Sequence, residues 1–199
     1  MHIDLTKIQA PQSSFWSCEK DIETILKRLF VDNTGDTNGE SFSKTLKRLL
    51  IVNTKDCLTN LNEPKYKAKL ADMNLSKLLQ EGYVKIVPKI RVPEFEDVKA
   101  YLIISFDNFV PTTNPKFRDC TVHFDIICHT DYWQMDNYQI RPLKIAGLID
   151  GLLNNSKLSG IGTFQFVGCN ELVLDETFSG YCLTYLATHG SDDLIEPEE

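Results

Sequence analysis

The sequence predicts an α+β fold, in which an antiparallel β-sheet of about four long strands carries a helix packed on one face. Two long runs rich in β-branched and aromatic residues, Val98–Phe109 and Asn114–Thr130, are separated by a proline turn. A largely apolar helical segment follows at Pro142–Leu153. Two further strand-like runs, Thr163–Leu174 and Ser179–His189, then form a closing hairpin.

The second long strand has two chemically different faces, because successive side chains of a strand point to opposite sides. One face carries Cys120, Val122, Phe124, Ile126 and Cys128. The other carries Thr121, His123, Asp125, Ile127 and His129. We therefore expect the first face to pack on an apolar layer and the second to meet water or another chain.

The helix at Pro142–Leu153 is expected to cover the apolar face. Only Lys144 and Asp150 are charged within it, which predicts burial around most of its circumference. Gly147 and Gly151 lie one turn apart, and each costs about 1 kcal/mol of helix propensity relative to alanine. That cost predicts a helix backbone held close to a neighbour. In the first strand of the hairpin, Gly168 predicts a β-bulge.

The first half of the chain reads as additions to this core. Amphipathic or short helices are predicted at Asp21–Phe30, Ser41–Val52 and Asn74–Glu81, the last ended by Gly82. The segment Tyr83–Phe95 alternates partly but contains two prolines, which favours an edge strand or an extended arm.

The helix at Ser41–Val52 has a start signal and a basic face. Ser41 or Ser43 is suited to the N-cap position. We expect Lys44, Lys47 and Arg48 to form a solvated face, with contact to an acidic partner as the alternative.

The length of 199 residues suits one domain with embellishments. We divide it into an N-terminal arm at 1–20, helices and an edge strand at 21–97, the core sheet and helix at 98–190, and an acidic tail at 191–199. A net charge of −7 argues against a sequence-specific nucleic-acid-binding surface. The longest apolar stretch is too short to span a bilayer, and no signal peptide is apparent. The six cysteines form no C-x-x-C pair and are expected to be small buried hydrophobes.

No known catalytic, phosphate-binding or metal-binding motif occurs in the sequence. We therefore expect no enzyme, no cofactor and no metal. The polar strand face of His123, Asp125 and His129 is the nearest arrangement to a metal site, but the two histidines stand about 20 Å apart on an extended strand. A hydrated or subunit-facing surface is the better interpretation.

Three aromatic residues, Tyr132, Trp133 and Tyr138, cluster between the second strand and the helix. Such a group can form a ligand pocket, anchor an interface or build a satellite core under a loop. The sequence leaves these readings open. We take the three aromatics, together with the polar strand face, as candidate subunit-interface residues.

The order of elements resembles the tail terminator family of long-tailed bacteriophages, of the lambda U protein type. The resemblance lies in an N-terminal helix, strands matching AYLIISFDNF and FRDCTVHFDIICHT, a helix matching RPLKIAGLIDGLL and a hairpin ending in YCLTYLATH. It covers roughly the last half of the chain plus the helix Asp21–Phe30. The segment Val31–Val98 departs from the family pattern, which leaves the precise role and the ring open.

The resemblance implies a structural virion protein that forms a ring, commonly hexameric, at the head-proximal end of the tail tube. Its implied partners are copies of itself, the tail tube protein and the head connector, with genome DNA passing through the ring. Assembly would take place in the host cytoplasm, without a membrane. The alternatives are another neck or head–tail joining protein, a component of a contractile-injection or secretion system, and a small soluble binding module or enzyme with an aromatic pocket.

Overall fold

The computed structural model describes residues 18–32, 41–59, 63–87, 100–114, 117–158 and 162–190. Most of the expected N-terminal arm, the loop at 33–40, most of the Tyr83–Phe95 segment and the acidic tail lie outside these ranges.

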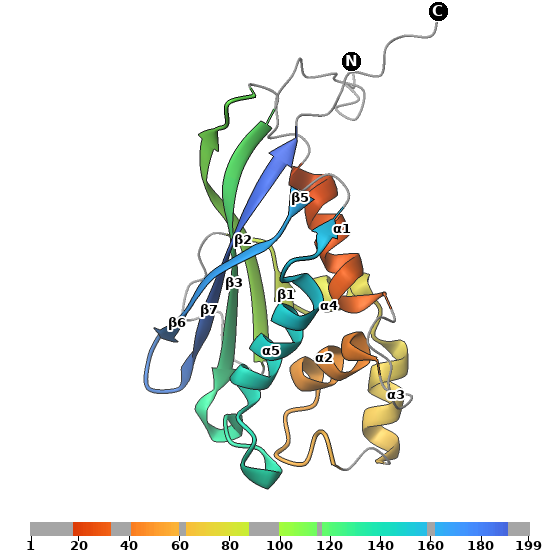
Figure 1. Ribbon diagram of the computed structural model, residues 1–199. Helices are drawn as coiled ribbons and strands as arrows, with labels where there is room; N and C mark the ends of the chain where they lie inside the picture. Colours follow the sequence, from red (N-terminus) through yellow and green to blue (C-terminus); the bar gives the residue numbers. More distant parts are fainter. Residues whose placement is uncertain are drawn as a thin grey trace, which may run out of the picture.

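The helices and strands follow an α+β order, in which most of the helices come before the strands along the chain (Figure 1). The helices are α1 (Cys18–Phe30), α2 (Phe42–Ile51), α3 (Pro64–Asp72), α4 (Leu75–Gln80) and α5 (Arg141–Leu153). The strands are β1 (Val84–Lys85), β2 (Ala100–Pro111), β3 (Phe117–His129), β4 (Lys157–Leu158), β5 (Gly162–Thr163), β6 (Gln165–Val173) and β7 (Phe178–Gly190).

The main sheet has five strands in the order β1-β2-β3-β7-β6. The four long strands pair antiparallel, and the register of β6 shifts between Phe166 and Gly168, which confirms the predicted bulge. The edge strand predicted near Tyr83 is β1, and it runs parallel to β2 with Val84 opposite Leu102. A parallel neighbour needs a long connection, which the stretch from Lys85 to Ala100 provides. The strand's direction was not evident from the sequence.

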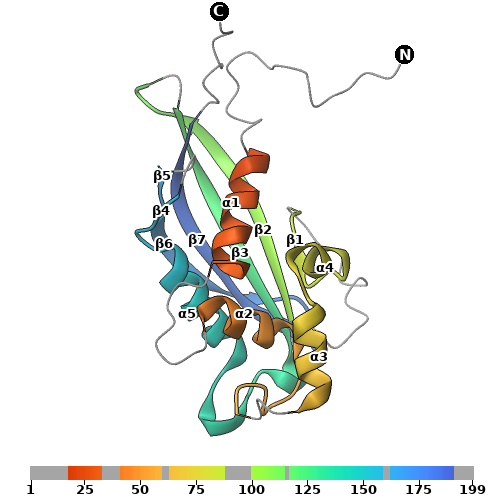
Figure 2. The same ribbon diagram turned by 90° about the vertical axis from the view of Figure 1, so that its right-hand side faces the viewer.

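Among the described elements, helices α1, α2 and α5 lie on one face of the sheet (Figure 2). The β3 side chains predicted to face an apolar layer are all completely buried there, as Phe124 at 0% exposure illustrates. On the opposite face, His123 and Asp125 are half-buried. Ile127 departs from this pattern, because it is buried in a second small cluster with Tyr101, Ile103 and Phe178. The predicted division of β3 into two faces is confirmed at all its other positions.

The predicted burial of α5 around most of its circumference is wrong. Its buried side chains form one stripe, whereas Leu143 is 44% exposed and Lys144 is exposed on the other side. Among the residues that the structure describes, neither glycine has the expected close neighbour. A Cβ added to Gly147 would meet nothing within 4 Å, and one added to Gly151 would meet only the Phe42 ring at 3.9 Å.

The predicted N-cap of helix α2 is confirmed, but the predicted solvated basic face is wrong at Arg48. The backbone N–H of Lys44 donates to the Ser41 hydroxyl at 3.3 Å. Lys44 is exposed and Lys47 is half-buried, but Arg48 is only 8% exposed and its Nε donates to the Cys57 carbonyl. Arg48 therefore faces inward because it satisfies a buried carbonyl of the following loop.

Helix α3 was not predicted, because its lysine-rich sequence has no long apolar period. Pro64 stands in its first turn, where the missing N–H costs nothing. Helix α4 confirms the short helix before Gly82, and the Asn74 side chain caps it by accepting from the Lys77 N–H at 2.9 Å. None of the helices in the described ranges is both long and apolar enough to cross a membrane.

Candidate functional site: the open face of the sheet

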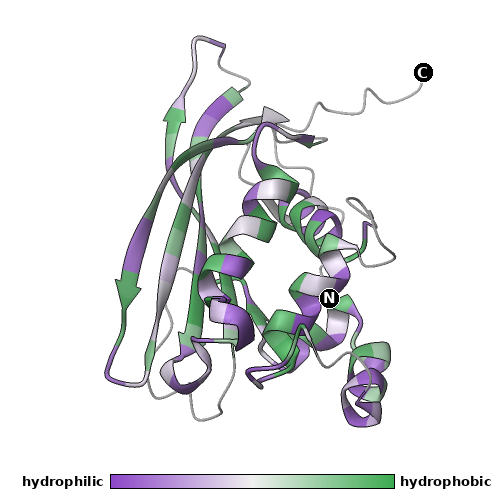
Figure 3. Cartoon of the chain, turned by 60° about the horizontal axis from the view of Figure 1, so that its bottom comes forward, coloured by the Kyte–Doolittle hydropathy of each residue, from purple (hydrophilic) through white to green (hydrophobic). Residues whose placement is uncertain are grey.

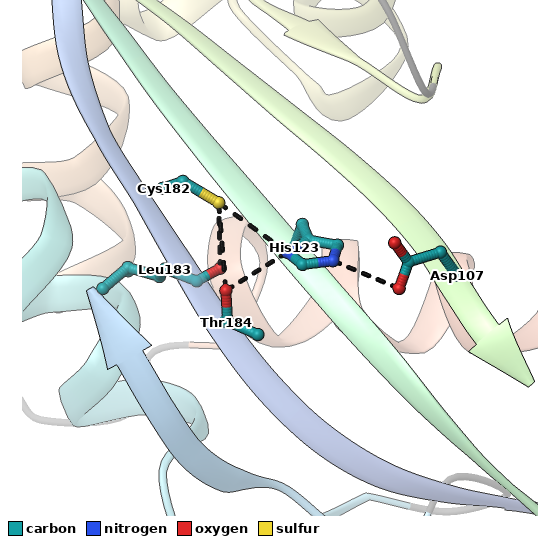
Figure 4. Close-up of polar contacts among 5 residues, drawn as sticks. All are labelled: Asp107, His123, Cys182, Leu183 and Thr184. Atoms are coloured by element: carbon teal, nitrogen blue, oxygen red, sulfur yellow. Dashed lines mark hydrogen bonds and ion pairs between the residues drawn. The ribbon is translucent and has the colours of Figure 1, made fainter. Parts of the chain in front are cut away.

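A row of polar side chains crosses the face of the sheet opposite the helices (Figure 4). His123 of β3 lies between Asp107 of β2 and two residues of β7. Its Nε2 is 3.2 Å from Asp107 Oδ1, and its Nδ1 is 3.2 Å from Thr184 Oγ1. Cys182 Sγ lies 3.7 Å from the same Nδ1. The register of three adjacent strands thus joins polar groups from three separate stretches of the sequence.

Asp125 lies directly opposite Cys182 in the ladder and so belongs to the same row. Burial raises the pKa of the Cys182 thiol to about 12, and the Asp125 carboxylate acts in the same direction because it opposes a second negative charge. A hydrogen bond from Thr184 acts weakly against this rise. Cys182 is therefore a neutral thiol rather than a reactive thiolate at pH 7.

His129, the third residue of the predicted polar face, lies apart from this row. Its Nδ1 accepts the backbone N–H of Asp131 at 3.2 Å, and its ring packs edge-on against Phe178 with centroids 5.1 Å apart. The structure therefore brings His123 and Asp125 together and assigns His129 to the turn that follows β3. Within the described residues, no three His, Cys, Asp or Glu side chains are placed to hold a metal ion.

The three predicted aromatics do not form one cluster. Trp133 is half-buried, stacks on Tyr181 at 6.0 Å and donates from Nε1 to the Ser179 carbonyl at 3.2 Å. Tyr132 is half-buried and lies 6.2 Å from the His129 ring. Tyr138 is 94% exposed. The half-buried pair fits the satellite-core reading, whereas Tyr138 does not.

Tyr138 is presented to solvent by a strained turn. Asn137 and Tyr138 both have positive φ, at 58° and 60°, a conformation that costs energy in residues other than glycine. Beside them is an open hollow of about 290 Å³ lined by Trp133, Gln134, Tyr138 and Ile140. This hollow contains few polar groups, so it is better suited to an apolar contact than to orienting a polar ligand.

Arg141 is the most important residue that the sequence reasoning missed. It is 1% exposed, and its guanidinium donates to the carbonyls of Leu49 at 2.6 Å, Val52 at 3.0 Å and Thr54 at 2.6 Å. Its Nε donates to the Tyr132 carbonyl at 3.0 Å. Arg141 therefore links the start of α5 by hydrogen bonds to the end of α2 and to the turn at Tyr132. The sequence signal that could have drawn attention to Arg141 is its position immediately before Pro142, at the start of α5.

Three of the described cysteines are buried in the core, and two are not. Cys57, Cys120 and Cys128 are buried, as predicted. Cys169 is exposed on β6 and Cys182 is half-buried, so for these two the prediction is wrong. Cys169 is exposed because β6 is an edge strand with little cover, as the exposure of Val167 (62%) and Val173 (66%) illustrates. Cys182 is on the central strand β7 but points to the open face of the sheet, beside His123.

The family model of YomW matches residues 43–187, from α2 through β7. The chain belongs to the YomW family. The family is named after a Bacillus phage SPBc2-region protein, which suggests a phage-related protein. No curated protein matches it. The YomW match includes the segment 43–97, which has no counterpart in the tail terminator pattern.

Proposed function

We propose that this YomW-family chain is a structural virion protein of a tailed phage, acting as a tail terminator or tail-completion protein. In this role it forms a closed ring, commonly of six copies, at the head-proximal end of the tail tube and joins the tube to the head connector. The ring assembles in the host cytoplasm and leaves a passage for genome DNA. Another neck position in the same virion is the nearest alternative.

The exposed edge strand β6 carries this proposal. Phe166 is 45% exposed, and Val167 and Val173 are more so, while the strand contains no lysine, arginine or proline. Soluble monomers usually protect a long edge strand with charge, proline or a covering segment. Without such protection, the unpaired backbone N–H and C=O groups can form hydrogen bonds with a strand of another chain. The Phe166–Gly168 bulge and Glu171 give only partial protection. Strand β6 is therefore suited to pairing with another chain.

The other edge of the sheet supports a head-to-tail contact. Strand β1 pairs with β2 only at Leu102 and Ile103, and within the described residues no strand covers the outer side of β2 from Ser105 to Asp107. Each copy thus has two different open edges. A contact between unlike edges repeats by rotation and closes into a ring when the angle permits.

A structural role is also favoured over a catalytic one. Cys182, His123 and Asp107 follow the order nucleophile, base and orienting carboxylate, but Cys182 belongs to a central strand whose neighbours β3 and β6 both pair with it. Backbone N–H groups engaged in those ladders are not available to stabilise an oxyanion. The raised pKa of the Cys182 thiol argues in the same direction.

The hollow beside Trp133 and Tyr138 favours the competing function, a small binding module. A ligand held there would quench the tryptophan fluorescence of the purified chain and protect Tyr138 from iodination. The hollow is open and lies at the low end of ligand-pocket volumes. For these reasons the assembly function is preferred.

The assembly proposal is tested by placing a charge on the β6 edge. Val167→Lys is expected to abolish ring formation in sedimentation velocity and on tail tubes in electron micrographs, while leaving the fold intact by circular dichroism. Val31→Lys is the matched control, since Val31 at the end of α1 is 54% exposed and remote from β6. Wild-type protein that stays monomeric at high concentration, with no ring on added tail tubes, would refute the proposal.

A further inference from the structure

The two edges of the sheet run in opposite directions. Strand β1 is parallel to β2, whereas β2 and β7 are both antiparallel to β3, and β6 is antiparallel to β7. Strand β6 therefore runs antiparallel to β1 and β2, which form the other edge. We call this other edge the β1–β2 edge, and it consists of Val84–Val87 and the outer side of Ser105–Asp107.

A ring built from these two edges joins them antiparallel. Rotation about a ring axis that runs along the strands moves each copy without reversing its strands. Strand β6 of one copy thus arrives beside the β1–β2 edge of the next copy in the opposite direction. Antiparallel ladders are slightly more stable per residue than parallel ones. The topology of the sheet therefore favours closure of the ring through strand pairing.

The ladder pairs place β6 at the same height as the β1–β2 edge. Across β7 and β3, Gln165 is level with Asp107, and Cys169 is level with Ile104. Continuation of the β1–β2 register brings Ile86 to the level of Ile104 as well. Rotation about an axis along the strands keeps these heights, so Cys169 would meet Ile86 of the next copy. Gln165 would meet Asp107 of the next copy, where its amide can donate to the carboxylate.

Strand β6 carries hydrophobic residues near both of its ends, and they fit the β1–β2 edge in the same register (Figure 3). Exposed Phe166 is level with Phe106 of β2, so that the two rings would face each other across the contact. Gly168 is level with Ser105 and therefore with Val87, which is 36% exposed. Among the described residues, a Cβ on Gly168 would meet nothing within 4 Å, which leaves room for the Val87 side chain. The pairing would therefore remove exposed apolar surface from both edges.

We propose that β6 of one copy pairs antiparallel with the β1–β2 edge of the next copy, so that the sheet continues from copy to copy. This inference rests on the proposed ring and names the strands, the direction and the register of its contact. The pairing puts α1, α2 and α5 of every copy on one side of the continuous sheet and the row of His123 on the other (Figure 2). Direct pairing of β6 with β6 of another copy would instead join like edges and stop at two copies.

Cross-linking through the native Cys169 thiol of the full-length chain tests the contact. In a C18S/C182S background, the native cysteines other than Cys169 are buried. Adding I86C is expected to give a ladder of covalent oligomers with a short bismaleimide reagent, because the two thiols of neighbouring copies lie side by side. The background alone and the variant I86C/C169S are each expected to give at least about tenfold less cross-linked chain, since a thiol of the pair is missing.

The direction of pairing is tested with cysteines at the two ends of β6. In the same background with C169S added, D107C/Q165C is expected to give at least about fivefold more ladder than D107C/V173C, since antiparallel pairing brings only Gln165 close to Asp107. Val173 would lie about 25 Å further along β6, beyond the reach of a short reagent. The reverse preference would indicate parallel pairing and would overturn the proposal.

Val31→Cys in the C18S/C182S background is the matched control, because Val31 is exposed but follows the end of α1, outside both edges. It is expected to give no ladder. A dimer that forms through Cys169 alone and stops at two copies would indicate pairing between two β6 strands and would overturn the proposal. Rings in electron micrographs without a ladder from I86C would overturn this contact and leave the proposed function standing. A chain that stays monomeric would refute both.

Discussion

The two faces of the sheet are built from alternating residues of the same strands, yet they differ in what they bury. On the helix-covered face of β3, side chains such as Val122 and Phe124 are at 0% exposure. On the open face, His123 and Asp125 remain half-buried and exchange polar contacts with neighbouring strands. The difference indicates that the covered face carries most of the stability, which leaves the open face free to change without loss of the fold.

The largest expected effect compares neighbouring residues of β3. Phe124→Ala should lower the free energy of unfolding by about 3–5 kcal/mol, because a fully buried ring that packs on Tyr185 leaves a cavity. His123→Ala should cost about 1 kcal/mol or less, since the partner Asp107 is 61% exposed. Urea unfolding measures both values. Similar losses for the two variants would contradict the proposed division between the faces.

The next expected effect concerns the attachment of the helix layer to the covered face. Arg141→Met should cost about 2–4 kcal/mol, because buried carbonyls of Leu49, Val52 and Tyr132 lose their donor. Lys144→Met, on the exposed side of the same helix, should change stability by about 0.5 kcal/mol or less. Thermal unfolding followed by circular dichroism would compare them. An Arg141 variant as stable as wild type would mean that water replaces the guanidinium.

The features that the sequence predicted well are those that depend on neighbouring residues along the chain. Alternation along β3 and the proline start of the helix near Pro142 are local signals, so the long strands, the two faces of β3 and the presence of a helix on the sheet followed from them. The single buried stripe of that helix did not follow. The cap at Ser41 and the bulge near Gly168 also have local signals. These features need no knowledge of distant partners.

Features that depend on distant partners were missed or misjudged. Arg48 and Arg141 look like solvated charges in sequence, but each finds buried carbonyls that only the folded chain supplies. The His123 row joins three strands, so neither Asp107 nor Cys182 could be assigned to it from spacing. The parallel direction of β1 likewise depends on a connection rather than on the strand's own residues.

Two glycines provide a third comparison, between a crowded and an open position. A Cβ on Gly180 of β7 would stand 1.7 Å from the Ile126 carbonyl oxygen, so Gly180→Ala should cost about 2 kcal/mol or more. Gly147→Ala meets nothing within 4 Å on the exposed side of α5 and should stabilise the chain by up to about 1 kcal/mol. Urea midpoints that shift in the same direction for both variants would contradict this reading.

The smallest expected effect compares a thiol on each face. Burial raises the pKa of Cys128 on the covered face to about 12 from an ordinary value of 9.0, so its contribution to stability is complete below pH 9 and is lost as the pH rises toward 12. Between pH 8 and pH 10 this thiol should account for about 1 kcal/mol of lost unfolding free energy. Cys128→Ala should remove that share of the pH dependence, as urea unfolding at the two pH values would measure. Cys182→Ala should change it less, because water reaches the half-buried thiol and screens its charge. Equal changes for the two variants would show that the open face excludes water as well as the helix-covered face does.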